Sequence, residues 1–323
     1  MKVLNWGILA TGNIAHQFCS DLQITPNNKV VAVCSRTLSN AQTFANEFNI
    51  QQAYDDYQVM LADPEVDVIY IATPHPFHYQ NTLDALRAGK HVVCEKPIGM
   101  SYEQVQHCVL EAQKNNCFLL EALWMYFFPA VQQAKTWIEQ GKVGAVNYLT
   151  ANFDFCPPQD PNHRLYNLEL GGGALMDIGL YPLFFSTLML GQGQFQHGFA
   201  LKHQTGADTV NQISCTHQDG SISNLSASFL VNKSNEAFVF GELGYIKLEN
   251  QFFCSKQVTL HLYNGQTSTL TFEHNGNGYG YEIEAVNSAI SAGNIECDEY
   301  SHEKMLSNHS LLTDVMAELQ VKY

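Results

Sequence analysis

The chain has 323 residues, with 16 Lys and Arg against 31 Asp and Glu, so its formal net charge is −15. An acidic chain is repelled by the phosphates of nucleic acids and by anionic membranes, so we expect neither as a partner. Hydrophobic residues make up 46% of the chain, which argues against disorder. At about 150 residues per domain, the length predicts two globular domains.

Cysteine usage indicates a reducing compartment. The chain has nine cysteines, an odd number, and no two have CxxC spacing. Several lie in apolar runs, so we expect reduced, buried thiols in a cytoplasmic protein. The N-terminal apolar run has strand length and meets a glycine turn, which favours a strand over a signal peptide. The most apolar stretch, Ala174 to Leu190, contains Asp177 and Pro182, looks too short to span a bilayer and is predicted to be a buried helix.

The first third of the chain alternates between two patterns. Short β-branched runs predict strands at Val3–Leu9, Lys29–Cys34, Val66–Ala72, Lys90–Glu95 and Cys117–Leu120. Helical spacing predicts helices at Ile14–Leu22, Ser39–Phe48, Tyr57–Ala62, His78–Ala88 and Tyr102–Asn115. Such alternation is typical of a parallel sheet with helices on both faces. We therefore expect a doubly wound, Rossmann-type domain over residues 1–121 that binds a dinucleotide.

After Glu121 the pattern changes. Helices are predicted near Ala130–Gln140 and after the glycines 171–173. From about Phe199 to Phe272, alternation rich in Thr, Ser and aromatic residues predicts a large, mostly antiparallel sheet. The last segments, Tyr281–Gly293 and His302–Leu319, return to helical spacing. Residues 122–323 are expected to form a second α/β domain, whose last helix can pack back on the first domain.

The turn after the first predicted strand suits a dinucleotide. Gly12 and Ala15 occupy the second and third small positions of the GxGxxG/A motif, and Ala10 stands at the first. The helix that follows offers free N–H groups and a partial positive charge to phosphates. An ordinary strand–helix turn is the alternative, and the position at the start of a βαβ pattern favours the cofactor site. The expected contacts are Ala10, Thr11, Gly12, Asn13 and Ile14.

The end of the second predicted strand selects between the two nicotinamide cofactors. NAD sites commonly place a carboxylate there, whereas this chain has Cys34-Ser35-Arg36-Thr37. Arg36 can pair with a 2′-phosphate. We therefore expect Ser35 and Arg36 to bind NADP, with NAD still possible, and a solvated arginine at a strand end is the alternative.

Two further segments carry candidate catalytic groups. Lys96 follows a strand in Glu95-Lys96-Pro97, at a carboxyl end that faces the ligand crevice in such sheets. Asp177 and Tyr181 are four residues apart, so they share one helix face in an otherwise apolar segment. A surface ion pair for Lys96, and a capping Asp with a core Tyr, are the structural alternatives.

Together these segments resemble the Gfo/Idh/MocA oxidoreductases. The glycine turn, Glu95-Lys96-Pro97 and Asp177-x-Gly-x-Tyr181 occur in the family's order. Within the family, the chain is similar to the branch of dimeric dihydrodiol dehydrogenases and NADP-dependent D-xylose dehydrogenases. The segments that carry this finer resemblance are Leu120-Glu121-Ala122-Leu123-Trp124, Phe127-Phe128-Pro129 and Asp177-x-Gly-x-Tyr181. The resemblance covers essentially the whole chain, including Tyr281-Glu282-x-Glu284. Tyr181 stands where many other branches have His.

The resemblance implies a Rossmann domain followed by an α/β domain whose open sheet forms a homodimer. It implies Lys96 as catalytic lysine near the nicotinamide ribose, and Tyr181 as acid/base residue with Asp177 beside it. The other implied cofactor contacts are Thr73, Pro74, His75, His78 and Glu95. The implied substrate contacts are Trp124, Phe153, Arg164 and Tyr181. No acid or cysteine completes a ligand set with His75 and His78, so we expect no metal.

The sequence thus predicts an NADP-dependent dehydrogenase for a hydroxyl of a small sugar, polyol or trans-dihydrodiol. One alternative is a cofactor-binding regulator without turnover, which would need only the cofactor half of the site. Another is redox-assisted elimination or glycoside cleavage, in which the cofactor stays bound and hydride returns to the substrate.

Overall fold

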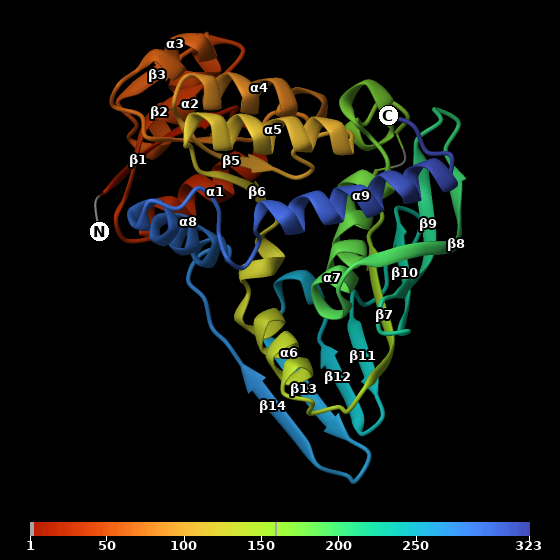
Figure 1. The fold of residues 1–323 in the computed structure, drawn as a ribbon. Coiled ribbons are helices and arrows are strands. Elements are labelled where there is room, and N and C mark those ends of the chain that lie inside the picture. Colours follow the sequence, from red (N-terminus) through yellow and green to blue (C-terminus); the bar gives the residue numbers. More distant parts are fainter. Residues whose placement is uncertain (1–2, 159) are drawn as a thin grey trace. The chain divides into compact units, whose positions relative to one another are not determined.

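The computed structural model describes residues 3–158 and 160–323. The chain divides into two compact units (Figure 1). Unit 1 contains Met1–Trp124 and His274–Leu306, and unit 2 contains Met125–Glu273 and Ser307–Tyr323.

Unit 1 is built on a six-stranded sheet in which every neighbouring pair is parallel, with strand order β3-β2-β1-β4-β5-β6. This order confirms the doubly wound Rossmann architecture. The strands are β1 (Leu4–Leu9), β2 (Asn28–Cys34), β3 (Gln52–Tyr54), β4 (Val68–Ile71), β5 (His91–Glu95) and β6 (Leu119–Ala122). The helices between them are α1 (Asn13–Ile24), α2 (Leu38–Phe48), α3 (Tyr57–Ala62), α4 (His75–Arg87) and α5 (Tyr102–Asn115).

Two features of this sheet differ from the prediction. The sequence did not indicate β3, because this edge strand has only three residues and none of them is buried. Helix α4 begins at His75, three residues before the predicted start, with Pro76 in its first turn. Proline is well accommodated there because the first N–H groups of a helix have no intrahelical partner.

Residues 274–306 belong to unit 1, although we had assigned all of 122–323 to one later domain. They include α8 (Gly280–Ala292) and the beginning of α9 (His302–Glu318). Buried Asp21 in α1 accepts hydrogen bonds from the backbone N–H groups of Asn277 and Tyr279, each at 2.9 Å. The Tyr300 hydroxyl donates to Glu121 Oε2 at 2.6 Å. These buried polar contacts attach the returning segment to α1 and β6 of unit 1. No local sequence pattern predicts them.

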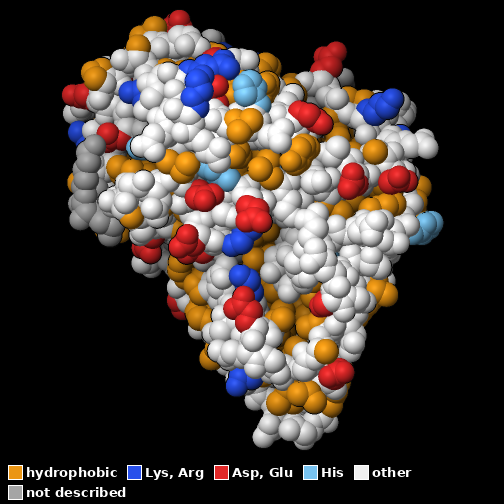
Figure 2. All heavy atoms as spheres, in the orientation of Figure 1, with side chains coloured by type: hydrophobic (Ala, Val, Ile, Leu, Met, Phe, Trp, Pro, Cys, Tyr) orange, Lys and Arg blue, Asp and Glu red, His pale blue; other side chains and the backbone are white. Residues whose placement is uncertain are grey.

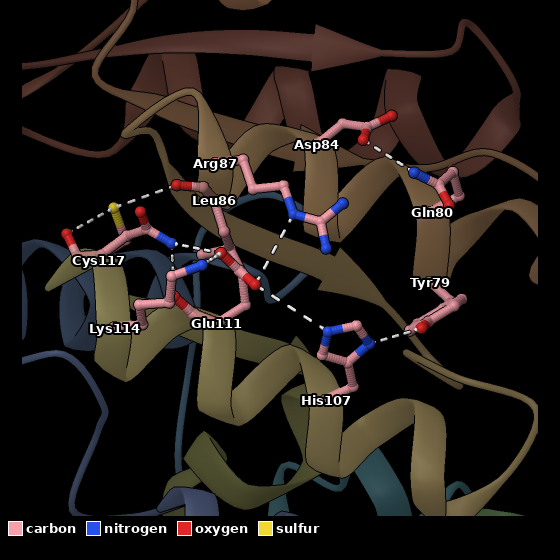
Figure 3. A network of polar contacts seen from close by, with 10 residues as sticks. Tyr79, Gln80, Asp84, Leu86, Arg87, His107, Glu111, Lys114 and Cys117 are labelled. Carbon is pink, nitrogen blue, oxygen red and sulfur yellow. Dashed lines mark hydrogen bonds and ion pairs between the residues drawn. The ribbon is translucent and has the colours of Figure 1, made fainter.

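Helices α4 and α5 are joined by a polar network around Glu111, which is 5% exposed (Figure 3). Glu111 Oε1 accepts from Lys114 Nζ at 2.9 Å, and Oε2 lies 3.7 Å from Arg87 Nε and 4.0 Å from His107 Nε2. The Tyr79 hydroxyl of α4 lies 2.7 Å from Nδ1 of the same histidine. The hydrogen bond from Lys114 is the largest of the effects that lower the pKa of Glu111. One carboxylate therefore connects two helices that cover the sheet.

Unit 2 contains an eight-stranded sheet with the order β14-β13-β12-β11-β7-β10-β9-β8. All neighbouring pairs are antiparallel except β10 with β7. The predicted, mostly antiparallel sheet is thus confirmed. Its strands are β7 (Val146–Asp154), β8 (Gly193–Lys202), β9 (Asp208–His217), β10 (Ile222–Ser228), β11 (Ala237–Gly241), β12 (Gly244–Leu248), β13 (Gln257–Leu262) and β14 (Thr267–Thr271).

Helices α6 (Pro129–Glu139) and α7 (Leu180–Leu190) also belong to unit 2. Short 3-10 turns lie at η1 (Trp124–Phe127), η2 (Arg164–Tyr166), η3 (Leu168–Leu170) and η5 (Phe252–Cys254). A π-helical turn, η4 (Leu175–Gly179), leads directly into α7. We had expected one regular helix there. π-turns are rare, and those that occur are frequently found at functional sites, so η4 is a candidate part of such a site.

The segment Leu168–Leu190 is long and apolar enough to cross a membrane by length and composition. The length argument made from the sequence was therefore wrong. However, 89% of its 18-residue apolar window is buried within the structure, which is typical of a core helix. Phe184 and Phe185 of α7 are fully buried. The prediction of a buried helix is confirmed by burial rather than by length.

Positive and negative side chains are mixed on the face of the molecule that Figure 2 shows. On the face that Figure 2 shows, Lys and Arg side chains stand singly or in small groups among acidic side chains. All nine cysteines are free thiols, and seven of them are buried.

Candidate active site

The glycine turn of unit 1 has the geometry of an anion site. Ala10 has a φ of +86°, and Gly12 is the N-cap of α1 with φ −79° and ψ 176°. Within α1, which the structure describes throughout, no side chain caps the first N–H groups and no acid lies in the first turn. A Cβ placed on Gly12 would meet none of the described atoms within 4 Å. The helix N-terminus is therefore open to a phosphate, and the turn fits a dinucleotide.

The carboxyl end of β2 contributes Ser35 and Arg36. The Ser35 hydroxyl lies 3.2 Å from the Thr11 hydroxyl of the glycine turn, and Arg36 is exposed. The structure adds two acids that the sequence analysis did not consider. Burial, and then the charges of Asp56 and Asp55, raise the pKa of Cys34 at this strand end to about 12. The end of β2, where we predict the 2′-phosphate to bind, thus has charges of both signs nearby.

Backbone contacts hold the loops after β4 and β5 together. His78 is 1% exposed, and its Nδ1 lies 2.8 Å from Pro97 O while its Nε2 lies 2.6 Å from Thr73 O. Burial lowers the pKa of His78, and the two carbonyls act in the opposite direction. The ring therefore bridges the two loops that border Lys96, and a direct contact of His78 with the cofactor stays a prediction. His75 is 9% exposed and begins α4.

Lys96 itself is half-buried, and its Lys96–Pro97 peptide bond is cis. The residues around it are fixed from inside the sheet. Tyr70 donates to Glu95 Oε1 at 2.5 Å, and Ile98 N donates to Glu121 Oε1 at 2.9 Å. Burial raises the pKa of Glu95, against the hydrogen bond from Tyr70 and the charge of Lys96. Glu95 is thus an interior anchor for the Lys96 loop, and its contact with the cofactor stays a prediction.

Unit 2 supplies the other predicted catalytic groups. Asp177 lies in the π-turn η4 and Tyr181 in the first turn of α7, and both are 7% exposed. Arg164 Nη1 lies 3.5 Å from Asp177 Oδ1. The structure thus brings Arg164 to the candidate acid, and its predicted contact with substrate stays a prediction.

An aromatic cluster surrounds Tyr181. Phe153 lies 5.5 Å from the Tyr181 ring, centroid to centroid, and stacks on Phe253 at 4.2 Å and 12°. Phe253 also lies 5.2 Å from Tyr181. Sequence analysis missed Phe253, because the pair Phe252-Phe253 had no distinguishing pattern in its surroundings. Flat aromatic faces beside a phenol are suited to a sugar or a ring-shaped diol.

Trp124 belongs to unit 1, where its indole stacks on Tyr279 at 4.6 Å and 19°. Tyr279 was not among the predicted residues, and the returning segment 274–306 brings it there. The predicted substrate contacts Trp124 and Phe153 therefore belong to different units, Trp124 to unit 1 and Phe153 to unit 2. Among the described residues, no group of three or more His, Cys, Asp or Glu could hold a metal.

Comparisons with known proteins agree with this architecture. Residues 4–122 match the GFO_IDH_MocA model, described as an oxidoreductase family with an NAD-binding Rossmann fold, and residues 131–247 match the GFO/IDH/MocA C-terminal domain. The trans-1,2-dihydrobenzene-1,2-diol dehydrogenase of Homo sapiens is 33% identical over 328 residues, covering 98% of this chain and 96% of the relative. The Xenopus tropicalis protein of the same name is 31% identical, covering 98% of both.

Solved structures share the fold over nearly the whole chain. A 3-ketoreductase from Actinomadura kijaniata, crystallised with NADP, has a TM-score of 0.88 at 23% identity and covers 98% of this chain and 97% of its own. An aldose-aldose oxidoreductase from Caulobacter crescentus has a TM-score of 0.89 at 20% identity, with 99% and 98% covered. From the matched domains, the full-length relatives and the open glycine turn, we conclude that the chain belongs to the Gfo/Idh/MocA family and is an NAD(P)-dependent oxidoreductase.

Proposed function

We propose that this oxidoreductase transfers hydride between NADP and a hydroxyl-bearing carbon of a small sugar, polyol or trans-dihydrodiol. The observation that carries the proposal is the cluster of Tyr181, Phe153 and Phe253, which combines a phenol with flat apolar rings. Such rings bind the C–H face of a sugar or the ring of a dihydrodiol, and the phenol can exchange a proton with a hydroxyl. The names of the relatives support the same substrate class.

The proposed roles follow from the chemistry of each group. A bound nicotinamide would supply the hydride donor or acceptor. Tyr181 takes the hydroxyl proton during oxidation and returns it during reduction; a phenol has an ordinary pKa of about 10, so a nearby cation is needed to favour its ionised form. Lys96 is proposed to stabilise the negative charge that develops on the substrate oxygen. Asp177, paired with Arg164, orients this end of the site.

Arg36 is proposed to select NADP over NAD. Changing Arg36→Ala should weaken NADP binding roughly tenfold or more and leave NAD binding nearly unchanged, as expected for one charge-assisted contact to the 2′-phosphate. Lys29→Ala is the matched control, because this exposed lysine lies near the amino end of the same strand, β2. Fluorescence titration with both cofactors gives the affinities. Equal affinities of the unmodified protein for NADP and NAD would contradict the assignment.

The assembly is proposed to be a homodimer formed through the sheet of unit 2. Tyr148, Phe238, Phe240, Tyr245 and His261 are partly exposed and contact one another across neighbouring strands; we call them the outer aromatic face. In a homodimer, the same face of a second copy of the chain would cover these residues across a two-fold axis. We also propose that the dinucleotide-binding domain first ends at residues 121 and 122, with residues 274–306 returning to it later in the chain. A cytoplasmic location is proposed from the nine free thiols.

The decisive experiment is a substrate panel of aldoses, polyols and trans-dihydrodiols, followed by NADPH absorbance. Net NADPH formation with one of these classes, at higher kcat/KM with NADP than with NAD, is the expected result. Substrate conversion without net NADPH formation, with cofactor that copurifies, would identify redox-assisted elimination instead. Tight NADP binding without turnover of any member would favour the regulator.

A further inference from the structure

The glycines that precede Asp177 make room for protein atoms. A Cβ on Gly172 would lie 2.5 Å from Arg164 O. Gly173 has a φ of +147°, and a Cβ there would overlap Asp208 Oδ1 and lie 2.6 Å from the Tyr323 ring. The groups that approach Gly173 are thus the side chains of Asp208 and Tyr323, whereas Gly172 is approached by backbone atoms of Arg164 and Asn167.

Asp208 begins β9 and is fully buried. Its Oδ2 accepts from Leu175 N and from Asn211 Nδ2, both at 2.7 Å, and its Oδ1 accepts from the Tyr323 hydroxyl at 2.6 Å. Leu175 is the first residue of the π-turn η4. The carboxylate therefore caps η4 from a distant strand, as an N-cap side chain would do locally.

Tyr323 makes the second contact to the same turn. Its hydroxyl accepts from Met176 N at 3.3 Å while it donates to Asp208. Burial, and then the charge of Asp208, raise the pKa of Tyr323 well above its ordinary value, so the phenol stays neutral and keeps its donor. In Figure 1 the C-terminal end lies beside the coil that leads into α7. Two side chains thus hold two successive N–H groups of η4.

We propose that Asp208 and Tyr323 are positioning residues that fix the π-turn and thereby set where Asp177 and Tyr181 point. A π-turn is less favourable than a regular helix and persists where tertiary contacts hold it. Asp177 lies directly after the two clamped N–H groups, and Tyr181 one turn further on. The inference rests on the proposed catalytic roles of Asp177 and Tyr181.

Tyr323→Phe tests the clamp, because it keeps the ring beside Gly173 and removes only the hydroxyl. We expect kcat to fall about tenfold with the KM for substrate and the affinity for NADP nearly unchanged, since the groups that bind are still present. Hydrogen exchange at the Leu175 and Met176 amides should become faster. Tyr57→Phe is the matched control, because it also removes a phenol-to-carboxylate hydrogen bond, to Asp84 Oδ2 at 2.8 Å, but in unit 1. It should leave kcat unchanged.

Asp208→Asn provides a second route to the same question. The double variant with Tyr323→Phe should lose little more kcat than the larger single loss, because both residues act through one hydrogen-bonded unit. Full kcat in Tyr323→Phe despite faster exchange, or unchanged exchange at Leu175 and Met176, would overturn the proposal. If Tyr181→Phe retains turnover, the proposed function fails first, and the exchange measurement still decides separately whether the clamp holds η4.

Discussion

At the residue scale, the backbone conformations of two small residues in the glycine turn each suit the other's residue type. The extended backbone of Gly12 would accept alanine, and the positive φ of Ala10 would favour glycine. Gly12 has ordinary extended backbone and open space around its Cβ position, so Gly12→Ala fits the folded chain. We expect thermal unfolding at the same temperature or slightly higher, because alanine lowers the entropy of the unfolded chain. NADP binding should nevertheless weaken at least about tenfold, since the methyl group stands where the backbone approaches the pyrophosphate.

Ala10→Gly is the reciprocal change. Ala10 has a φ of +86°, which costs a residue with a Cβ roughly 1–2 kcal/mol. Glycine should therefore raise the free energy of unfolding by about 1 kcal/mol, measured by chemical denaturation, without weakening NADP binding. A loss of stability in this variant would contradict the strain inferred from the φ of Ala10. Unchanged NADP affinity in Gly12→Ala would show that the turn does not hold the cofactor as proposed.

The proposed catalytic residues give a second test at this scale. Lys96→Met and Tyr181→Phe keep side-chain bulk and remove the cation and the phenol hydroxyl, so each should lower kcat by about 10²–10⁴. NADP binding should survive Tyr181→Phe. Steady-state kinetics with a substrate from the panel gives the values. Asp177→Asn should cost less, and the Lys96/Tyr181 double variant should lose less than the product of the single losses. Near-full turnover of Lys96→Met would refute the assignment.

At the element scale, the Glu111 network predicts how the α4–α5 pair responds to pH. The pKa of Glu111 is lower in the folded protein, so its contribution is complete above the unfolded value of about 4.3 and is lost as the pH falls through the folded value. Glu111→Gln should therefore lower Tm at pH 7, and the difference from the unmodified protein should shrink as the pH falls below about 4.

Glu139→Gln is the control for this prediction. Glu139 pairs with Lys135 on α6 at 3.4 Å, but its side chain is 62% exposed, so the ion pair is expected to contribute little at any pH. Differential scanning calorimetry from pH 7 down to the acid limit gives both curves. A Tm difference for Glu111→Gln that does not depend on pH would mean that packing, and not the charge, joins the helices.

At the scale of the whole molecule, the outer aromatic face predicts the oligomeric state. Light scattering at micromolar concentration should give twice the mass of one chain. Phe240→Asp places a charge in the centre of this face, where Phe240 contacts both Tyr148 and Tyr245, and should give a folded monomer. Leu110→Asp on α5 is the control, because Leu110 is 55% exposed in unit 1 and its substitution should leave the dimer intact. A monomer mass for the unmodified protein would contradict the proposed assembly.

The sequence by itself determined most strands and helices of the first sheet, although it missed β3 and placed the start of α4 three residues late. Continuous apolar runs such as β4, whose four residues are all buried, arise only where both faces of a strand are covered, so local pattern was sufficient for the parallel sheet. The same pattern placed Gly12, Arg36 and Lys96 at carboxyl ends of strands. Because those ends share one edge of a parallel sheet, a sequence can indicate a cofactor site without showing any contact.

Only the tertiary structure decided which residues support these groups. Asp208 and Tyr323 hold η4 across 33 and 147 residues of sequence, respectively, and Phe253 reaches Phe153 from a turn that no periodicity marks. The return of residues 274–306 to unit 1 likewise involves two buried carboxylates, Asp21 and Glu121, that accept hydrogen bonds from the returning segment. Such contacts are set by chain topology and by the requirement that buried polar groups be paired, and local spacing carries no record of either.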